Sequence, residues 1–221
     1  MKTTLLIILL TVSLLGNAWS ILKRWIPRFG FKRMGERWHS TILISDLRGF
    51  TNLFEKLSPE EIVKILNSYF EEMTEIILDN GGTVDKFMGD SILAVFGIPK
   101  PLLESEKTAV LCALKMQSCL NSLNQKRTAK GQFGLEMGIG IAAGDVIAGN
   151  IGSNKRMEYT VIGNAVNTAY RLQSIAGRGA IMTTNRVLDK IVDIVEYRKL
   201  PPQLIKGSNQ PIEIVEITGL K

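Results

Sequence analysis

The chain has 221 residues, of which 45% are hydrophobic and 22% are charged, so it is long enough for one globular domain with a short extension. All of its formal net charge of +6 lies before residue 38, where seven basic residues stand against one acidic residue. A nucleic-acid reader would carry its basic patch on the folded domain, so we exclude nucleic acid as a partner. The two cysteines, Cys112 and Cys119, have neither metal-site nor disulfide spacing and indicate a reducing compartment.

The N-terminal segment is the most apolar part of the chain. Twenty uncharged residues lie between Lys2 and Lys23, and as a helix they would span about 30 Å, the thickness of a bilayer core. A basic cluster follows, which by the positive-inside rule places the rest of the chain in the cytoplasm. We expect a membrane anchor helix at 1–24, a basic juxtamembrane linker at 25–38 and a folded domain at 39–221. A cleaved signal peptide is the alternative.

The first predicted elements of the domain are a strand and a long helix. The run Thr41–Ser45 is apolar and rich in β-branched residues, which predicts a central strand ending at Asp46. An ionised carboxylate there is unfavourable unless it is paired or metal-bound. The segment SPEE at 58–61 is a capping box with proline at the first helical position, and NGG at 80–82 ends that helix.

The remaining elements complete an alternating order. We predict strands at 83–87 and 91–96 joined by a tight turn that contains Asp90, then a helix from Glu106 to about Lys126. A strand at 134–143 follows, and then a hairpin pair at 145–151 and 157–162. The order indicates an α+β fold with a ferredoxin-like βαββαβ core and a C-terminal extension, preceded by one transmembrane helix.

Two aspartates stand out because each lies at a strand end beside a glycine-containing turn. Alone, Asp46 or Asp90 would be interpreted as a turn former or a helix cap. Together, and with Lys86 close by in the sequence, they indicate carboxylates that share divalent metals for phosphoryl chemistry.

Five ordered segments extend this interpretation. They are SDLRGFT at 45–51, DKFMGDSILAVFG at 85–97, GIGIAAGDVIAGNIGS at 138–153, EYTVIGNAVNTAYRL at 158–172 and LIKG at 204–207. With them the chain resembles the class III nucleotidyl cyclases from about Thr41 to Thr218. The resemblance implies that 39–221 is a catalytic domain and that active sites form between two such domains, hence a homodimer. A domain that consumes ATP belongs in the cytoplasm, which favours a single-pass anchor in the inner or plasma membrane over a signal peptide.

The resemblance also implies a two-metal site. Asp46 and Asp90 match the metal-binding aspartates, which would hold two Mg²⁺ or Mn²⁺ ions per active site, and the Leu47 carbonyl would complete one coordination shell. The metals would activate the ribose 3′-hydroxyl and neutralise charge on the phosphates. The backbone amides of residues in the following turn would cradle phosphate oxygens; these residues are Gly49, Phe50 and Thr51.

Two residues match the base-selecting positions of the family. Lys86 carries an ammonium that only donates, so it complements adenine N1 and opposes guanine N1–H. Thr160 stands where the commonest pattern has aspartate, and its hydroxyl can accept from the adenine N6 amino group. Lys86 lies four residues before Asp90, too far along an extended hairpin for both to reach one small pocket. This spacing suits a dimer in which the two residues serve opposite sites.

Asn167 and Arg171 match the transition-state pair of the family. They lie four residues apart on a predicted helix and share one face. Asn167 would orient the ribose, and Arg171 would stabilise charge on the α-phosphoryl oxygens. Lys206 matches a lysine near the β- and γ-phosphates. Lys155 and Arg156 are further phosphate candidates, which spacing does not separate from plain surface charges.

We therefore interpret the sequence as an adenylyl cyclase that converts ATP to 3′,5′-cyclic AMP and pyrophosphate by in-line attack of the ribose 3′-oxygen. A guanylyl cyclase is one alternative, opposed by Lys86 and Thr160. A catalytically silent cyclase-homology module that dimerises or regulates is the other. Such modules typically lose a metal aspartate or the Asn/Arg pair, and this chain has lost neither.

Overall fold

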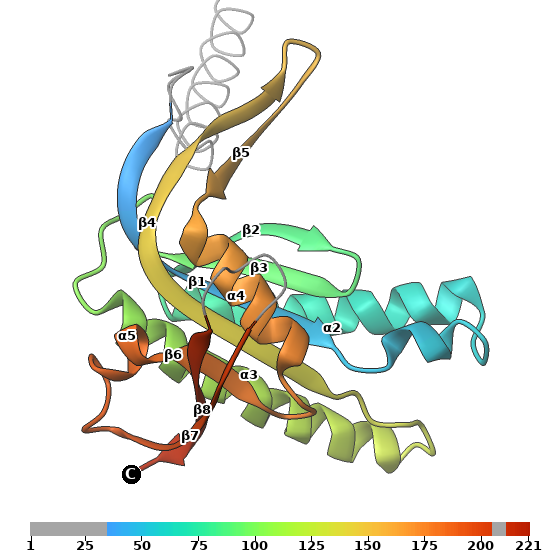
Figure 1. Cartoon of the computed structure of the whole chain (residues 1–221). Coiled ribbons are helices and arrows are strands. Elements are labelled where there is room, and N and C mark those ends of the chain that lie inside the picture. Colours follow the sequence, from blue (N-terminus) through green and yellow to red (C-terminus); the bar gives the residue numbers. More distant parts are fainter. Residues whose placement is uncertain (1–34, 205–210) are drawn as a thin grey trace, which may run out of the picture. The chain divides into compact units, whose positions relative to one another are not determined.

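The computed structural model describes residues 35–204 and 211–221 (Figure 1). The chain divides into the units Met1–Met34 and Gly35–Lys221, and the description below concerns the second. The predicted anchor helix at 1–24, most of the linker and Lys206 lie outside the described residues. Among the described helices, none is long and apolar enough to cross a membrane.

The core is one eight-stranded sheet whose first part has the predicted ferredoxin-like order. Strands β2, β3, β1 and β4 lie side by side, and every neighbouring pair is antiparallel. The elements of this part are β1 (Glu36–Leu47), η1 (Phe50–Leu53), α2 (Pro59–Asp79), β2 (Gly82–Met88), β3 (Ser91–Phe96), α3 (Ser105–Thr128) and β4 (Met137–Ser153). The predicted capping box is present at the start of α2, where Ser58 and Glu61 bond each other's backbone amides.

The C-terminal extension lengthens the same sheet. Its elements are β5 (Arg156–Ile162), α4 (Asn164–Ile175), β6 (Ile181–Thr184), α5 (Asn185–Leu188), β7 (Val195–Gln203) and β8 (Ile212–Leu220). Strand β6 joins β4 in parallel, β8 and β7 follow antiparallel, and β5 pairs only with β4. The predicted α+β fold with a C-terminal extension is therefore confirmed for the described residues.

Strand β4 corrects the prediction of two separate strands at 134–143 and 145–151. It is a single strand of 17 residues, Met137–Ser153. The ladder with β1 runs through Gly144, which lies opposite Ser40, so the glycine does not interrupt the strand. Strand β1 itself begins at Glu36, inside the segment assigned to the linker. The distal part of β4 and β5 form an arm that extends from the sheet (Figure 1).

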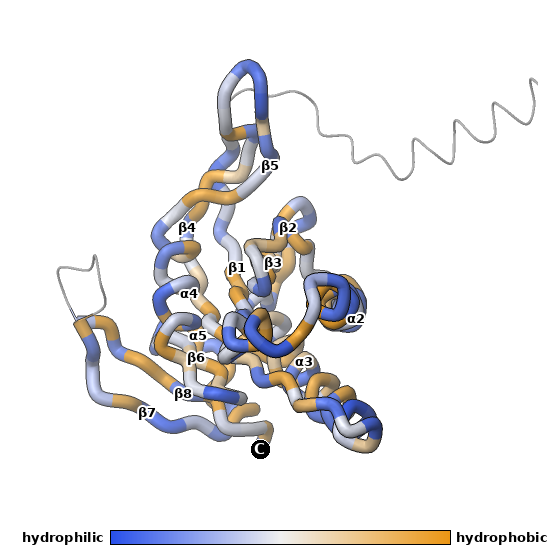
Figure 2. The backbone as a smooth tube through the Cα atoms, turned by 90° about the vertical axis from the view of Figure 1, so that its right-hand side faces the viewer, coloured by the Kyte–Doolittle hydropathy of each residue, from blue (hydrophilic) through white to orange (hydrophobic). Residues whose placement is uncertain are grey.

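The sheet has a hydrophobic core on each face. Along β1, Leu43 and Leu47 pack toward α2 and α3, whereas Ile42 and Ile44 pack toward α4. Figure 2 shows the corresponding hydrophobic stretches along the strands, with hydrophilic residues in the loops and on the arm's tip. Because side chains alternate along a strand, the next even-numbered residue, Asp46, is directed to the α4 face.

Helix α4 lies so close to β4 that Gly140 has no room for a side chain. A Cβ there would overlap the Ala169 carbonyl oxygen and the Gln173 amide nitrogen, which are backbone atoms of α4. We expect Gly140→Ala to lower the free energy of unfolding by about 2 kcal/mol and Tm by about 6 °C in a thermal melt. Gly177→Ala is the matched control, since its nearest neighbour would be 4.0 Å away. Equal shifts in the two variants would contradict this close approach.

Candidate active site

The two predicted metal-binding carboxylates meet at one end of the sheet. Asp46 pairs with Ser91 in the β1–β3 ladder, and Asp90 occupies the turn directly before Ser91. The Ser91 hydroxyl donates to Asp46 Oδ1, and Arg48 Nη1 donates to Asp46 Oδ2 at 3.1 Å. The register of this hairpin against β1 therefore brings together two residues that lie 44 positions apart in the sequence.

The electrostatics of this pair fit a divalent cation. Burial raises the pKa of Asp90, and the charge of Asp46 raises it further. Burial also raises the pKa of the Tyr69 hydroxyl on α2, and the charges of both carboxylates add to that shift. The two carboxylates repel each other, and a bound Mg²⁺ or Mn²⁺ ion would remove that repulsion. No third acidic, histidine or cysteine side chain joins them within the described part of the chain, which leaves backbone, water or nucleotide oxygens as the other ligands.

The repulsion leads to a prediction for the metal-free protein. A raised pKa means that ionised Asp90 destabilises the folded state above the unfolded-state pKa, and therefore at neutral pH. We expect Asp90→Asn to raise Tm in EDTA by about 1–2 °C, a small shift because the group is half exposed. Mn²⁺ should then stabilise the wild type more than the variant, because ligand binding to the native state raises its stability. A variant less stable than the wild type in EDTA would contradict this account.

Arg48 is a site residue that sequence reasoning missed. Its guanidinium donates to Asp46 and also to the backbone carbonyl of Gln173, near the end of α4. It lies over Gly138, where a Cβ would collide with it. Arg48 thus connects Asp46, the first predicted metal ligand, to the helix that carries Asn167. No sequence signal identifies this contact, because the acceptor is a main-chain oxygen 125 residues away.

The turn after β1 places the predicted phosphate-binding amides. Gly49 adopts a left-handed φ of 69° and is followed by η1, whose first residue Phe50 is buried. Thr51 is exposed, and Leu47 directs its side chain into the core. Leu47 can therefore offer only its backbone carbonyl to a metal. The first amides of such a helix lack intrahelical partners, which leaves them able to donate to an anion. Their role toward phosphate stays a prediction.

The predicted base-selecting residues gather in a second cluster between β2 and β5. Lys86 Nζ lies 2.9 Å from Glu158 Oε1 and 3.6 Å from Asp85 Oδ2. The Thr160 hydroxyl donates to the same Asp85 oxygen at 2.8 Å. Asp85 therefore connects Lys86 and Thr160 within one protomer. Sequence reasoning overlooked Asp85 because its neighbour in the motif carried the expected chemistry.

The other predicted residues occupy separate places. Asn167 is exposed and Arg171 is half buried on α4, the helix that packs on β4 and β1. Lys155 and Arg156 are exposed where β4 turns into β5, and their amides both donate to Ser153 Oγ at 3.3 Å. The structure thus brings together the two carboxylates and, separately, Lys86 and Thr160, while Lys155 and Arg156 lie on the arm.

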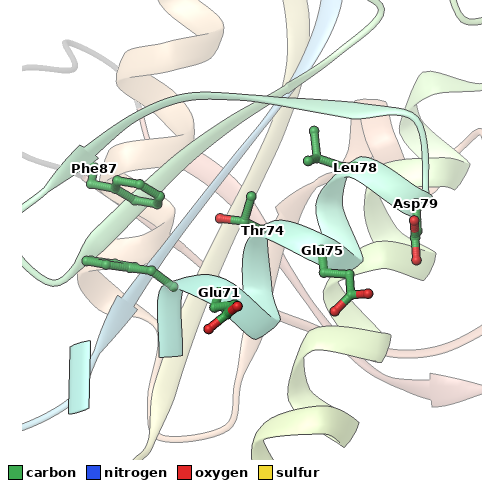
Figure 3. A pocket seen from close by; sticks show the side chains of 7 residues that line it. Glu71, Thr74, Glu75, Leu78, Asp79 and Phe87 are labelled. Carbon is green, nitrogen blue, oxygen red and sulfur yellow. The ribbon is translucent and has the colours of Figure 1, made fainter. Parts of the chain in front are cut away.

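A hollow between α2 and β2 contains none of these residues (Figure 3). Phe70 and Phe87 stack at its edge with their ring centroids 4.2 Å apart, and Glu71, Glu75 and Asp79 line it from α2. Strand β2 thus presents Phe87 to α2, whereas the preceding Lys86 contacts Glu158 of β5. The hollow is therefore separate from the base-selecting cluster.

Comparison with known proteins matches the chain to nucleotide cyclases. Residues 34–213 match the family described as the adenylate and guanylate cyclase catalytic domain. Adenylate cyclase 1 of Rhizobium meliloti is 30% identical over 190 residues, which cover 85% of this chain and 29% of that protein. The chain spans about a third of the length of the curated relatives it matches.

Solved structures agree with this match. The adenylyl cyclase CyaB from P. aeruginosa has a TM-score of 0.80 at 35% identity, over 83% of this chain and 95% of that one. The guanylyl cyclase Cya2 has a TM-score of 0.77 at 44% identity, over 85% and 95%. Family match, fold and paired carboxylates point the same way, and the chain belongs to the class III adenylyl and guanylyl cyclases, as a nucleotidyl cyclase catalytic domain.

Proposed function

We propose that this cyclase is an adenylyl cyclase that converts ATP to 3′,5′-cyclic AMP and pyrophosphate. The observation that carries the proposal is the cluster around Asp85, because it gathers Lys86 and Thr160 on one side of β2 and β5. An ammonium donor and a hydroxyl acceptor complement adenine, which has an acceptor at N1 and a donor at N6. Guanine reverses both groups.

Each functional group then has a role in the reaction. Asp46 and Asp90 would hold two Mg²⁺ or Mn²⁺ ions, which lower the pKa of the ribose 3′-hydroxyl and offset phosphate charge. Asn167 orients the ribose so that its 3′-oxygen is in line with the leaving pyrophosphate. Arg171 stabilises the charge that develops on the α-phosphoryl oxygens. Lys206 is proposed to contact the β- and γ-phosphates.

We propose that the active enzyme is a homodimer with two equivalent sites. Each site would take its carboxylates from one protomer and Lys86, Thr160, Asn167 and Arg171 from the other. The residues at 1–24 would anchor each protomer in the inner or plasma membrane, with the catalytic domain in the cytoplasm, since the basic cluster follows the apolar run.

A guanylyl cyclase is the second candidate, favoured by the 44% identity to the guanylyl cyclase Cya2. Overall identity reflects the whole domain, whereas base choice depends on the few groups that contact the purine. Lys86 opposes guanine because its ammonium would face the N1–H donor. We therefore place this candidate behind the adenylyl cyclase.

The test is product formation by the purified chain over a range of protein concentrations. ATP or GTP is supplied with Mn²⁺ or Mg²⁺, and cyclic AMP and cyclic GMP are quantified. Cyclic AMP as the main product, with specific activity rising as protein is concentrated, supports a dimeric adenylyl cyclase. Cyclic GMP as the main product would overturn the base assignment but keep the metal site. No product under any condition would favour the silent module.

A further inference from the structure

Asp85 lies in a β-bulge that redirects its side chain. Val84 pairs with Ala94 and Lys86 pairs with the adjacent Leu93, so Asp85 is an extra residue in β2 with no partner in the ladder. In a regular strand, neighbouring side chains point to opposite faces, whereas a bulge re-aims one of them. Asp85 and Lys86 consequently both reach β5, where they contact Thr160 and Glu158.

The contacts of Asp85 fix the direction of one hydrogen bond. Its side chain is only 7% exposed, and its Oδ2 accepts from the Thr160 hydroxyl at 2.8 Å. Burial raises the pKa of Asp85, while the Thr160 hydroxyl and the Lys86 ammonium favour its ionised form. In this contact the Thr160 hydroxyl is the donor, so its hydrogen points at Asp85 Oδ2.

This direction determines what Thr160 can offer to a base. A hydroxyl has one hydrogen and two lone pairs. With the hydrogen bonded to Asp85, the oxygen presents only lone pairs to any other group. It can accept from an amino group at purine position 6, as in adenine, and it cannot donate to a carbonyl oxygen there, as in guanine. A freely rotating hydroxyl would serve either base.

We propose that Asp85 is a positioning residue for substrate selection: it holds the Thr160 hydroxyl as an acceptor, so the cyclase favours purines with a donor at position 6. The inference rests on the proposed function, because it takes Thr160 as a base-contacting residue. It adds a reason why a threonine, which by itself is neutral between the two bases, selects one of them.

The experiment measures kcat/KM for ATP and for GTP in four variants of the full chain. Asp85→Asn can offer an amide N–H to Thr160 and release its hydrogen, so we expect the ATP preference to fall at least about tenfold. Thr160→Val should also lower the ATP preference. In the double variant with Asp85→Asn, the ratio of kcat/KM for ATP to that for GTP should differ less than about twofold from its value in Thr160→Val alone. Glu158→Gln, which removes the other carboxylate from Lys86, is the matched control and should change it less than about threefold.

The outcomes distinguish the base-contacting role of Thr160 from the positioning role of Asp85. An unchanged preference in Thr160→Val overturns the base assignment in the proposed function. A changed preference in Thr160→Val with an unchanged one in Asp85→Asn overturns only the role of Asp85. If Asp85→Asn has an equal effect in the wild type and in Thr160→Val, the role of Asp85 is overturned as well, because the effect would then not act through the Thr160 hydroxyl.

A second measurement on the wild type covers the case in which Asp85→Asn fails to fold. N6-methyl-ATP and 6-methoxypurine riboside triphosphate are similar in size, and both keep the N1 acceptor for Lys86. The first has a donor at position 6 and the second an acceptor. We expect kcat/KM to favour N6-methyl-ATP by at least about tenfold. Equal values for the two analogues would overturn the proposal.

Discussion

Asp46→Asn is expected to lower kcat/KM for ATP by about 10³-fold, equivalent to about 4 kcal/mol of transition-state stabilisation. The substitution is isosteric, so the hydrogen bond from Ser91 can persist and β1 keeps its place between β3 and β4. What it removes is one of two negative charges that would bind divalent cations. The measurement is steady-state cyclic AMP formation over a range of Mn²⁺ concentrations, with Tm as a check on folding.

The control for this prediction is another aspartate on the same sheet. Asp145 is exposed, and its Oδ1 lies 3.2 Å from His39 Nδ1. It lies eight residues along β4 from Met137, which pairs with Leu47 at the other end of the ladder. Asp145→Asn removes an equal charge but no proposed ligand, so activity should stay within about twofold of the wild type. Asp46→Asn activity above about a tenth of the wild-type value, at any Mn²⁺ concentration, would contradict the metal assignment.

Local signals in the sequence were enough to predict most of the core. The capping box before α2 and the tight turn before Ser91 act over a few residues, and the structure has both. The break predicted near Gly144 was wrong because the strand is held by its neighbour: β1 pairs along both halves of β4. Tertiary pairing overrides the local preference of a glycine for a turn.

The two carboxylates of the candidate site could be predicted from the sequence, but the residues that orient the site's side chains could not. Asp46 and Asp90 could be identified as candidates because two carboxylates at strand ends occur together, with Lys86 close by in the sequence. Arg48 and Asp85 could not, since each acts through a partner that is distant in the sequence: a main-chain oxygen of Gln173 and the hydroxyl of Thr160. A β-bulge at Asp85 is also invisible in a pattern of alternating residues, because it arises from how two strands pair.

Arg171→Ala is expected to lower kcat by about 10²-fold, or about 3 kcal/mol, with little change in KM for ATP. The guanidinium would act on charge that appears on the α-phosphoryl oxygens only as the reaction proceeds, so ground-state binding should be nearly unaffected. Asn167→Ala, on the same face of α4, should also reduce kcat through ribose orientation. A tenfold rise in KM with unchanged kcat for Arg171→Ala would instead place the arginine in ground-state binding.

Mixing variants tests whether the two sets of residues belong to different protomers. If each site combines the carboxylates of one protomer with the arginine of the other, a heterodimer of Asp46→Asn and Arg171→Ala has one intact site. Random reassociation makes half of the dimers heterodimers, so the mixture should recover about a quarter of wild-type activity. Asp46→Asn mixed with Asp90→Asn is the matched control: both changes affect the carboxylates, so no site is intact and no activity should return. Equal activities in the two mixtures would mean that each protomer builds its site alone, and the separation of Lys86 from Asp90 along the hairpin would then need another explanation.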